Sequence, residues 1–163
     1  MGDDCDVVLI GAGIMSATLG TLLCKLEPGL RIQAFERLDR AAAESSDAWN
    51  NAGTGHAGYC ELNYTPAVEG TVDCSKATRI AAQFGLSLEL WRSLVASGDV
   101  PETPSFIRQV PHLSFVDGEH VGFLRTRATE LARSSLFRDI EYSEDRAQIA
   151  EWIPLVMEGR GDT

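Results

Sequence analysis

Two short apolar runs with a helical pattern between them open the chain. Residues 7–10 are too few and too rich in β-branched side chains for a helix, and they predict a buried parallel strand. Residues 31–35 predict a second strand. Between them, a helix is expected over about 14–26, ended by Pro28-Gly29. Its face toward the sheet is expected to carry four leucines, namely Leu19, Leu22, Leu23 and Leu26.

The longest helical pattern lies in the middle of the chain. Asp73 or Ser75 is placed to cap the start of this helix, and Gly98 is placed to end it. Apolar side chains recur at the spacing of one helix face, which predicts a core-facing stripe. The stripe consists of Ile80, Phe84, Leu88, Trp91 and Val95.

Shorter patterns predict the remaining elements. Alternation of apolar and polar side chains indicates strands, and a period near 3.6 indicates helices. We expect a short helix over 40–48, a loop over 60–72, strands over 106–110 and 113–116 before a turn at 117–118, a helix over 119–133, and a short helix from its cap at Ser143 to Trp152. Only two strands of a nucleotide-binding sheet are recognisable, so the α/β domain is expected to be incomplete, as in a fragment of a longer protein.

The turn after the first strand reads Gly11-Ala-Gly13-Ile-Met-Ser16. Gly11 can adopt the backbone angles of a sharp strand-to-helix turn, and Gly13 leaves room for a pyrophosphate to approach the main chain. Ser16 takes the place of the usual third glycine or alanine. Glu36, 25 positions after Gly11, suits a ribose hydroxyl and repels the 2′-phosphate of NADP. A chance glycine-rich turn is the alternative, but the flanking strand, helix and acid favour a dinucleotide-binding βαβ unit.

Charge and composition argue against several partners. With 24 acidic and 14 basic residues among 163, the net charge is −10, which opposes binding to nucleic acid and offers no polybasic patch to an anionic membrane. No apolar run reaches the roughly 18 residues of a membrane span, and the N-terminus does not resemble a signal peptide. The cysteines at 5, 24, 60 and 74 form no CxxC pair, so we expect thiols and no metal site.

A second glycine-rich segment covers residues 50–58 and reads Asn-Asn-Ala-Gly-Thr-Gly-His-Ala-Gly. This composition excludes a regular element and leaves backbone N–H groups free to meet a ligand. Trp49 and Tyr59 flank the segment and suggest that it is partly buried. An ordinary surface loop is the alternative; we expect ligand contact.

These motifs together resemble the N-terminal third of the malate:quinone oxidoreductase family. The specific part is the block at residues 49–66; the glycine turn alone would fit many families. Further matches are Phe35-Glu-Arg-Leu38, Glu44-Ser-Ser46, Ser75-Lys-Ala77, Val110-Pro-His112, Tyr142-Ser-Glu-Asp145 and Glu151-Trp152. The resemblance implies an FAD-dependent bacterial enzyme with a glutathione-reductase-type Rossmann-like fold. Such an enzyme oxidises (S)-malate to oxaloacetate and reduces a membrane quinone, as a peripheral protein at the inner face of the cytoplasmic membrane that serves the citric acid cycle and respiratory chain.

The resemblance also implies roles for individual residues. Residues 1–75 would bind FAD, and 76–163 would lead into a substrate domain. His56 is the candidate catalytic base, with a structural histidine as the alternative and His112 as a weaker candidate. Substrate-binding arginines are expected outside this chain. The cofactor-binding residues would be Gly11, Gly13 and Ser16 at the pyrophosphate, Glu36 at the adenosine ribose, and Ser45, Ser46, Asn51, Gly53, Thr54, Gly55 and His56 beside the ribityl chain or flavin ring. Ile14, Met15 and Arg37 are expected to bind the cofactor as well.

Three other functions stay open at this point. A flavin-dependent 2-hydroxy- or amino-acid oxidase of the same fold would reduce oxygen instead of quinone. An NAD-dependent dehydrogenase would share the Glu36 chemistry, and only the block at 49–66 argues against it. Finally, residues 1–163 alone are expected to be catalytically inactive, as a partial nucleotide-binding module.

Overall fold

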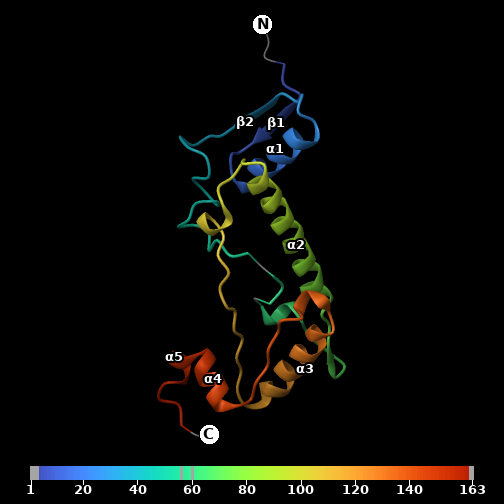
Figure 1. The fold of residues 1–163 in the computed structure, drawn as a ribbon, viewed down its shortest axis with the longest axis vertical. Coiled ribbons are helices and arrows are strands. Elements are labelled where there is room, and N and C mark those ends of the chain that lie inside the picture. Colours follow the sequence, from blue (N-terminus) through green and yellow to red (C-terminus); the bar gives the residue numbers. More distant parts are fainter. Residues whose placement is uncertain (1–3, 56, 60, 162–163) are drawn as a thin grey trace. The chain divides into compact units, whose positions relative to one another are not determined.

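The computed structural model describes residues 4–55, 57–59 and 61–161. The chain divides into two compact units, Met1–Thr54 and Gly55–Thr163 (Figure 1). The fold is mixed α/β, with a parallel strand pair in the first unit and mainly helices in the second. The predicted division after residue 75 concerns cofactor and substrate roles, and it stays a prediction.

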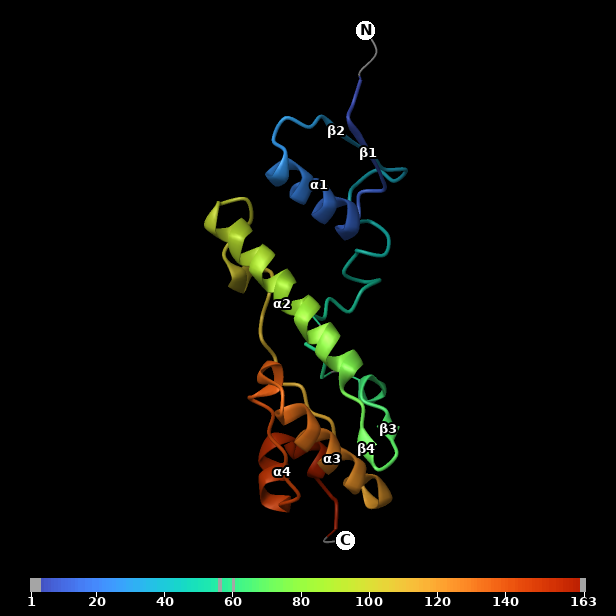
Figure 2. The same ribbon diagram turned by 90° about the vertical axis from the view of Figure 1, so that its right-hand side faces the viewer.

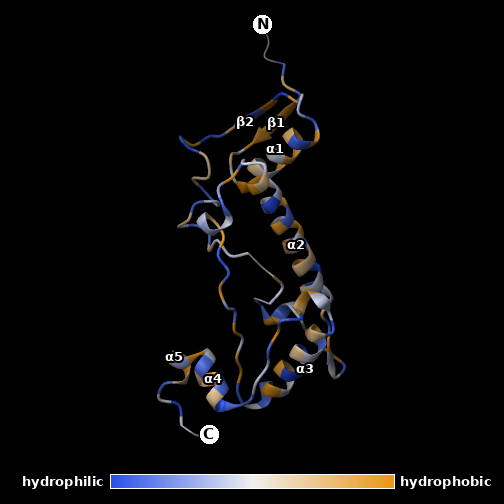
Figure 3. Cartoon of the chain, in the orientation of Figure 1, coloured by the Kyte–Doolittle hydropathy of each residue, from blue (hydrophilic) through white to orange (hydrophobic). Residues whose placement is uncertain are grey.

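The first unit is a βαβ arrangement, as predicted. Strand β1 (Val7–Ile10) leads into helix α1 (Ile14–Leu26), and strand β2 (Ile32–Phe35) returns parallel to β1. The register pairs each residue of β1 with its counterpart in β2, from Val7 opposite Ile32 to Ile10 opposite Phe35. Strand β1 is hydrophobic along its length (Figure 3), whereas β2 includes the polar Gln33. The arrangement is consistent with part of a Rossmann-like sheet.

Helix α1 approaches β1 at Gly20, and of the four leucines predicted to face the sheet only Leu23 is half-buried. A Cβ on Gly20 would lie 3.1 Å from Cδ1 of Leu9, so the helix and strand approach closely at this glycine. Leu9 is the buried residue of β1. Leu19, Leu22 and Leu26, expected against the sheet, are exposed. Two four-residue strands give too narrow a surface to cover the whole apolar face of a 13-residue helix.

The second unit is built around helices α2 (Ser75–Ala96) and α3 (Val121–Ala132), seen from two sides in Figures 1 and 2. Both helices were predicted. Their shared core is small and combines the start of α2, the end of α3 and the 3₁₀ turn η4 (Ser135–Phe137). Its buried members are Ala77, Ala81, Leu131 and Phe137. The predicted stripe of α2 is half-buried instead, and Trp91 packs edge-to-face with Phe84 and Phe106.

Short elements complete this unit. A hairpin of β3 (Ala67–Val68) and β4 (Thr71–Val72) replaces part of the expected loop at 60–72. Its turn residues Glu69 and Gly70 have φ of +46° and +84°, which is the backbone of a type I′ turn. The others are η1 (Leu62–Tyr64), η2 (Thr103–Ser105), η3 (Gly118–His120), α4 (Arg146–Trp152) and α5 (Pro154–Met157).

Two further predictions of local structure were wrong. Residues 106–110 and 113–116 form no strand, because no segment in the described part of the chain pairs with them. Helix α4 is capped by Asp145, whose side chain accepts a hydrogen bond from the Gln148 N–H, and not by Ser143. The Ser143 hydroxyl instead accepts the N–H of Asp145 and fixes the cap.

Candidate functional site

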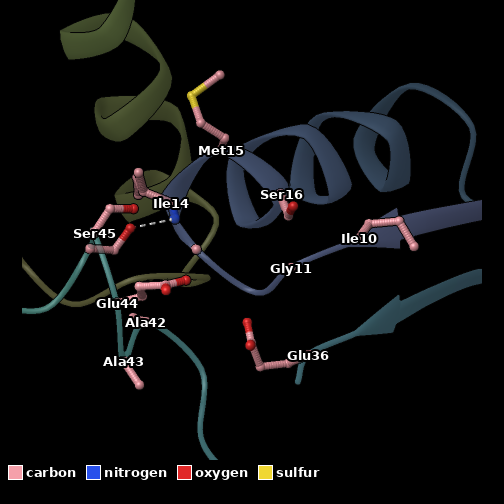
Figure 4. A pocket seen from close by; sticks show the side chains of 12 residues that line it. Ile10, Gly11, Ile14, Met15, Ser16, Glu36, Ala42, Ala43, Glu44 and Ser45 are labelled. Carbon is pink, nitrogen blue, oxygen red and sulfur yellow. Dashed lines mark hydrogen bonds between the residues drawn. The ribbon is translucent and has the colours of Figure 1, made fainter. Parts of the chain in front are cut away.

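A pocket of about 240 Å³ opens where β1 runs into α1 (Figure 4). Ligands of open α/β sheets bind beyond the carboxyl ends of the strands, and this pocket lies at that end of β1 and β2. Pockets that enclose a drug-sized ligand measure about 300–1,000 Å³, so this one suits part of a dinucleotide. Its lining consists of Ile10, Gly11, Gly13, Ile14, Met15, Ser16, Glu36, Ala42, Ala43, Glu44, Ser45 and Ser46.

The two glycines of the turn are required for different reasons. Gly11 has φ of +88°, a conformation that side chains disfavour, while a Cβ there would meet nothing within 4 Å. Its N–H donates to the Phe35 carbonyl at 2.7 Å, which joins the turn to β2. Gly13 has an ordinary φ of −85°, but a Cβ there would lie 3.1 Å from the Ser46 hydroxyl. Glycine is therefore required at position 11 by the backbone conformation, and at position 13 by the lack of space for a side chain.

The start of α1 faces this pocket with backbone donors. Gly13 is the N-cap and offers no side chain, and the first turn carries no acidic residue. The Ile14 N–H donates to Oγ of Ser46 at 3.0 Å (dashed line in Figure 4). The first N–H groups of a helix lack partners within the helix, and the dipole makes this end positive. The site therefore favours an anionic group such as a phosphate.

Glu36 closes the opposite side of the pocket. Its Oε2 accepts the Ala12 N–H at 2.8 Å, and its Oε1 accepts the Leu38 N–H at 3.0 Å. The hydrogen bonds from Leu38 and then Ala12 hold the pKa of Glu36 below its usual value, so the side chain is ionised at neutral pH. Figure 4 shows the carboxylate pointing toward the Gly11 turn. Each oxygen keeps a further lone pair, which can accept a hydrogen bond from a ribose hydroxyl.

Residues 42–46 line the remaining side of the pocket. They belong to a series of turns and not to the short helix predicted over 40–48. Ala42, at φ of +56°, donates its N–H to the Ala12 carbonyl at 3.0 Å. The Asp47 carboxylate accepts the Trp49 N–H at 2.9 Å and also binds Arg40. Short polar side chains that bond nearby backbone groups compete with helix formation, which explains the difference.

The loop after this wall contains several of the predicted cofactor residues. Asn51 donates from Nδ2 to the Ser45 carbonyl at 3.2 Å and accepts the Gly53 N–H at 2.7 Å. The irregular loop over 50–55 was predicted. Trp49, however, is 96% exposed, so the expectation of burial on this side is wrong. The Asn51 contact attaches the loop to the pocket wall.

The predicted site residues therefore fall into separate groups. Eight of the fourteen line one pocket: Gly11, Gly13, Ile14, Met15, Ser16, Glu36, Ser45 and Ser46. Arg37 forms an ion pair with Glu44 beside it, and Asn51, Gly53 and Thr54 do not line it. Gly55 belongs to the second unit and abuts the Phe84 ring. His56, the candidate base, lies outside the described residues.

A second pocket of about 350 Å³ lies within the helical unit, and it contains the weaker candidate His112. There Glu144 accepts both Arg125, at 2.7 and 2.9 Å, and the Tyr142 hydroxyl at 2.6 Å. These hydrogen bonds, with the Arg125 bonds the largest contribution, lower the pKa of Glu144 to about 2. The lining is otherwise mostly apolar, with Leu113, Phe115, Val121, Leu124, Ile149 and Trp152 among its members.

One buried charged residue was missed in the sequence. Arg127 is only 4% exposed, and burial lowers the pKa of its guanidinium. Its Nε donates to Oγ1 of Thr65 at 2.8 Å, and its Nη2 donates to the Tyr59 carbonyl at 3.1 Å. The signal was present, because Arg127 lies three positions after Leu124 and four before Leu131, which places all three on one helix face.

The described residues lack two further features. No cluster of three or more histidine, cysteine, aspartate or glutamate residues in ranges 4–55, 57–59 and 61–161 is arranged to hold a metal ion. None of the helices formed by these residues has the length and apolarity needed to traverse a bilayer.

Comparison with known proteins gives a consistent result. The family model for malate:quinone oxidoreductase matches residues 3–163. Probable malate:quinone oxidoreductases of Flavobacterium johnsoniae, Geobacillus kaustophilus and Pseudomonas aeruginosa are 55%, 54% and 56% identical over 157 residues. Each alignment covers 95% of this chain and 32%, 31% and 30% of the relative, respectively. The chain thus spans about a third of the length of these relatives.

Proposed function

This chain belongs to the malate:quinone oxidoreductase family, and we propose on that premise that its full-length protein oxidises (S)-malate to oxaloacetate with FAD as the cofactor and a quinone as the electron acceptor. The observation that carries the cofactor assignment is the pocket at the Gly11 turn. Malate and quinone as substrates follow from the family and from the similar proteins, which are named for this reaction.

The pocket residues fit the adenosine diphosphate half of FAD. The space reserved by Gly13 and the N–H groups at the start of α1 suit the pyrophosphate. The ionised Glu36 suits the hydroxyls of the adenosine ribose and repels a 2′-phosphate, which disfavours NADP. Ser46 holds the Ile14 N–H and thereby keeps the helix start in place. These roles use only groups that line one pocket.

The remaining part of the proposed cofactor site comes from the loop at 51–56. Asn51 attaches this loop to the pocket wall at Ser45, so the loop leaves the pyrophosphate site at a defined point. We assign the loop to the flavin half of the cofactor and His56 to the proton of the malate hydroxyl. When bound, FAD would accept the hydride from C2 of malate, while the protein binds and orients the substrate and takes up the proton.

About two-thirds of the length of the relatives lies beyond the region matched by this chain. The arginines that bind the two malate carboxylates, and much of the flavin pocket, are assigned to that part. Residues 1–163 alone are accordingly proposed to be inactive. The full-length protein is proposed to act as a peripheral protein at the inner face of the cytoplasmic membrane.

The function is tested with the purified full-length protein and malate. We expect malate-dependent reduction of a soluble quinone analogue under anaerobic conditions, no hydrogen peroxide in air beyond that of a malate-free control, and no dependence on added NAD. Stoichiometric hydrogen peroxide would indicate the oxidase alternative. NAD-dependent turnover by a protein without flavin would contradict the proposal.

A further inference from the structure

We propose that Arg127 is a positioning residue for the glycine-rich loop at residues 50–58, and that it acts by fixing the segment directly after this loop. The inference rests on the proposed function, because the loop is assigned there to the flavin. Arg127 itself lies on α3, far along the chain from the loop: 68 residues separate it from Tyr59.

The guanidinium of Arg127 binds both ends of the segment at 59–65. Nη2 donates to the Tyr59 carbonyl at 3.1 Å, and Nε donates to Oγ1 of Thr65 at 2.8 Å. Thr65 is fully buried, and its hydroxyl donates in turn to the Leu62 carbonyl at 3.0 Å. Two donors on one rigid planar group therefore set the separation of the two ends.

Charge pairing does not account for the burial of this arginine. In the described part of the chain, Arg127 has no carboxylate within ion-pair distance and bonds only to neutral acceptors. Two residues earlier on the same helix, Arg125 is exposed and binds Glu144 through two hydrogen bonds. Burying a cation without a counter-ion is unfavourable, so the hydrogen bonds to the segment at 59–65 must offset much of this cost.

The residue just before Tyr59, Gly58, lies close to α2 and to Phe137. Gly58 has φ of +87°, and a Cβ there would lie 2.6 Å from the Ala77 carbonyl and 3.2 Å from the Phe137 ring. The Tyr59 ring packs edge-to-face on Phe137, with centroids 5.0 Å apart. The end of the loop thus lies between the start of α2, Phe137 and Arg127. Only three positions separate Tyr59 from His56, so a displacement of the Tyr59 carbonyl changes the path available to the loop.

The test compares three variants of the full-length protein: Arg127→Met, Arg127→Lys and Arg125→Met. Three properties of the bound flavin are measured: the dissociation constant of FAD, the visible circular dichroism and the midpoint potential. For Arg127→Met we expect the dissociation constant to rise about tenfold, together with a changed dichroism spectrum and a shifted potential, because hydrogen bonds from a charged donor are lost. The flavin properties of Arg127→Lys should fall between those of this variant and of the wild type, because a lysine ammonium cannot reproduce the planar two-donor geometry that binds both Tyr59 and Thr65.

Arg125→Met is the matched control, since it removes an exposed arginine from the same helix. We expect it to leave all three flavin properties unchanged. A folded Arg127→Met variant with wild-type flavin properties would overturn the inference, whereas flavin bound by the wild type would still support the proposed function. A wild-type protein that binds no flavin would overturn both. If Arg127→Met does not fold, Thr65→Val takes its place, because it removes only the hydroxyl that accepts Nε of Arg127. A smaller change of the flavin properties in the same direction supports the inference, and unchanged flavin properties overturn it.

Discussion

Replacement of Gly13 by alanine separates the binding role of this residue from its role in folding. The backbone of Gly13, at φ of −85°, is ordinary for alanine. The new Cβ would lie 3.1 Å from Oγ of Ser46, and ordinary contacts begin at 3.4 Å, so the hydroxyl must move by a few tenths of an ångström. Since Oγ accepts the Ile14 N–H at 3.0 Å, the variant weakens one exposed hydrogen bond, worth about 1 kcal/mol.

The expected effect on FAD is larger than the effect on folding. Under the proposed assignment, the Cβ would occupy the space through which the pyrophosphate reaches the backbone N–H groups. Loss of one hydrogen bond to a charged group costs about 1.5–3 kcal/mol. Because about 1.4 kcal/mol corresponds to a factor of ten, the dissociation constant of FAD should rise about 10- to 100-fold.

The assay titrates the full-length apoprotein with FAD and follows flavin fluorescence, with urea unfolding of the apoprotein measured in parallel. Gly29→Ala is the matched control in the same unit, because its backbone is not left-handed and a Cβ there meets only a flexible Glu27 side chain at 3.8 Å. It should bind FAD like the wild type. Equal FAD affinity for Gly13→Ala and wild type would refute the assignment of the pyrophosphate to this turn.

Three further outcomes follow from the same structure. Gly58→Ala should destabilise the protein by more than Gly70→Ala. Both variants incur the left-handed backbone penalty of about 1–2 kcal/mol, but only the Cβ at position 58 would meet a backbone carbonyl, that of Ala77 at 2.6 Å. Equal midpoints of urea unfolding would contradict this. Glu36→Gln should weaken FAD binding while leaving the fold intact, as circular dichroism and a FAD titration would show; unchanged affinity would remove Glu36 from the site. The lowered pKa of Glu144 stabilises the native state above pH 4.5, and this contribution is lost as the pH falls toward about 2. The melting temperature of Glu144→Gln should therefore depend less on pH in this range than that of the wild type. The same pH dependence for both proteins would contradict the pairing of Glu144 with Arg125.

Local signals were enough to predict the βαβ arrangement of the first unit. The bounds of α1, from Ile14 to Leu26, agree with the prediction because a glycine turn before it and Pro28-Gly29 after it leave little freedom. The sequence also predicted that Glu36 and Ser46 belong to one site. The prediction for Glu36 came from its spacing, and that for Ser46 from the family resemblance. These features depend on residues within a few dozen positions of one another.

Features that depend on distant partners were not predictable in the same way. The contact of Arg127 with Tyr59 spans 68 positions. The helical spacing places Arg127 on an apolar helix face, but it does not show which distant backbone carbonyl the guanidinium binds. Residues 106–110 and 113–116 have a strand pattern, but a strand needs a partner that the described residues do not supply. The exposure of Trp49 likewise depends on its tertiary surroundings and not on the residues beside it.

The most direct test of the central claim is the visible absorption spectrum of the full-length protein, recorded before and after anaerobic addition of malate. We expect a bound flavin whose visible absorption bleaches with malate, because the cofactor that carries the redox chemistry is reduced by the substrate. A flavin that stays oxidised in malate would contradict the substrate assignment. A colourless protein that binds NAD instead would contradict the assignment of the Gly11 pocket to FAD.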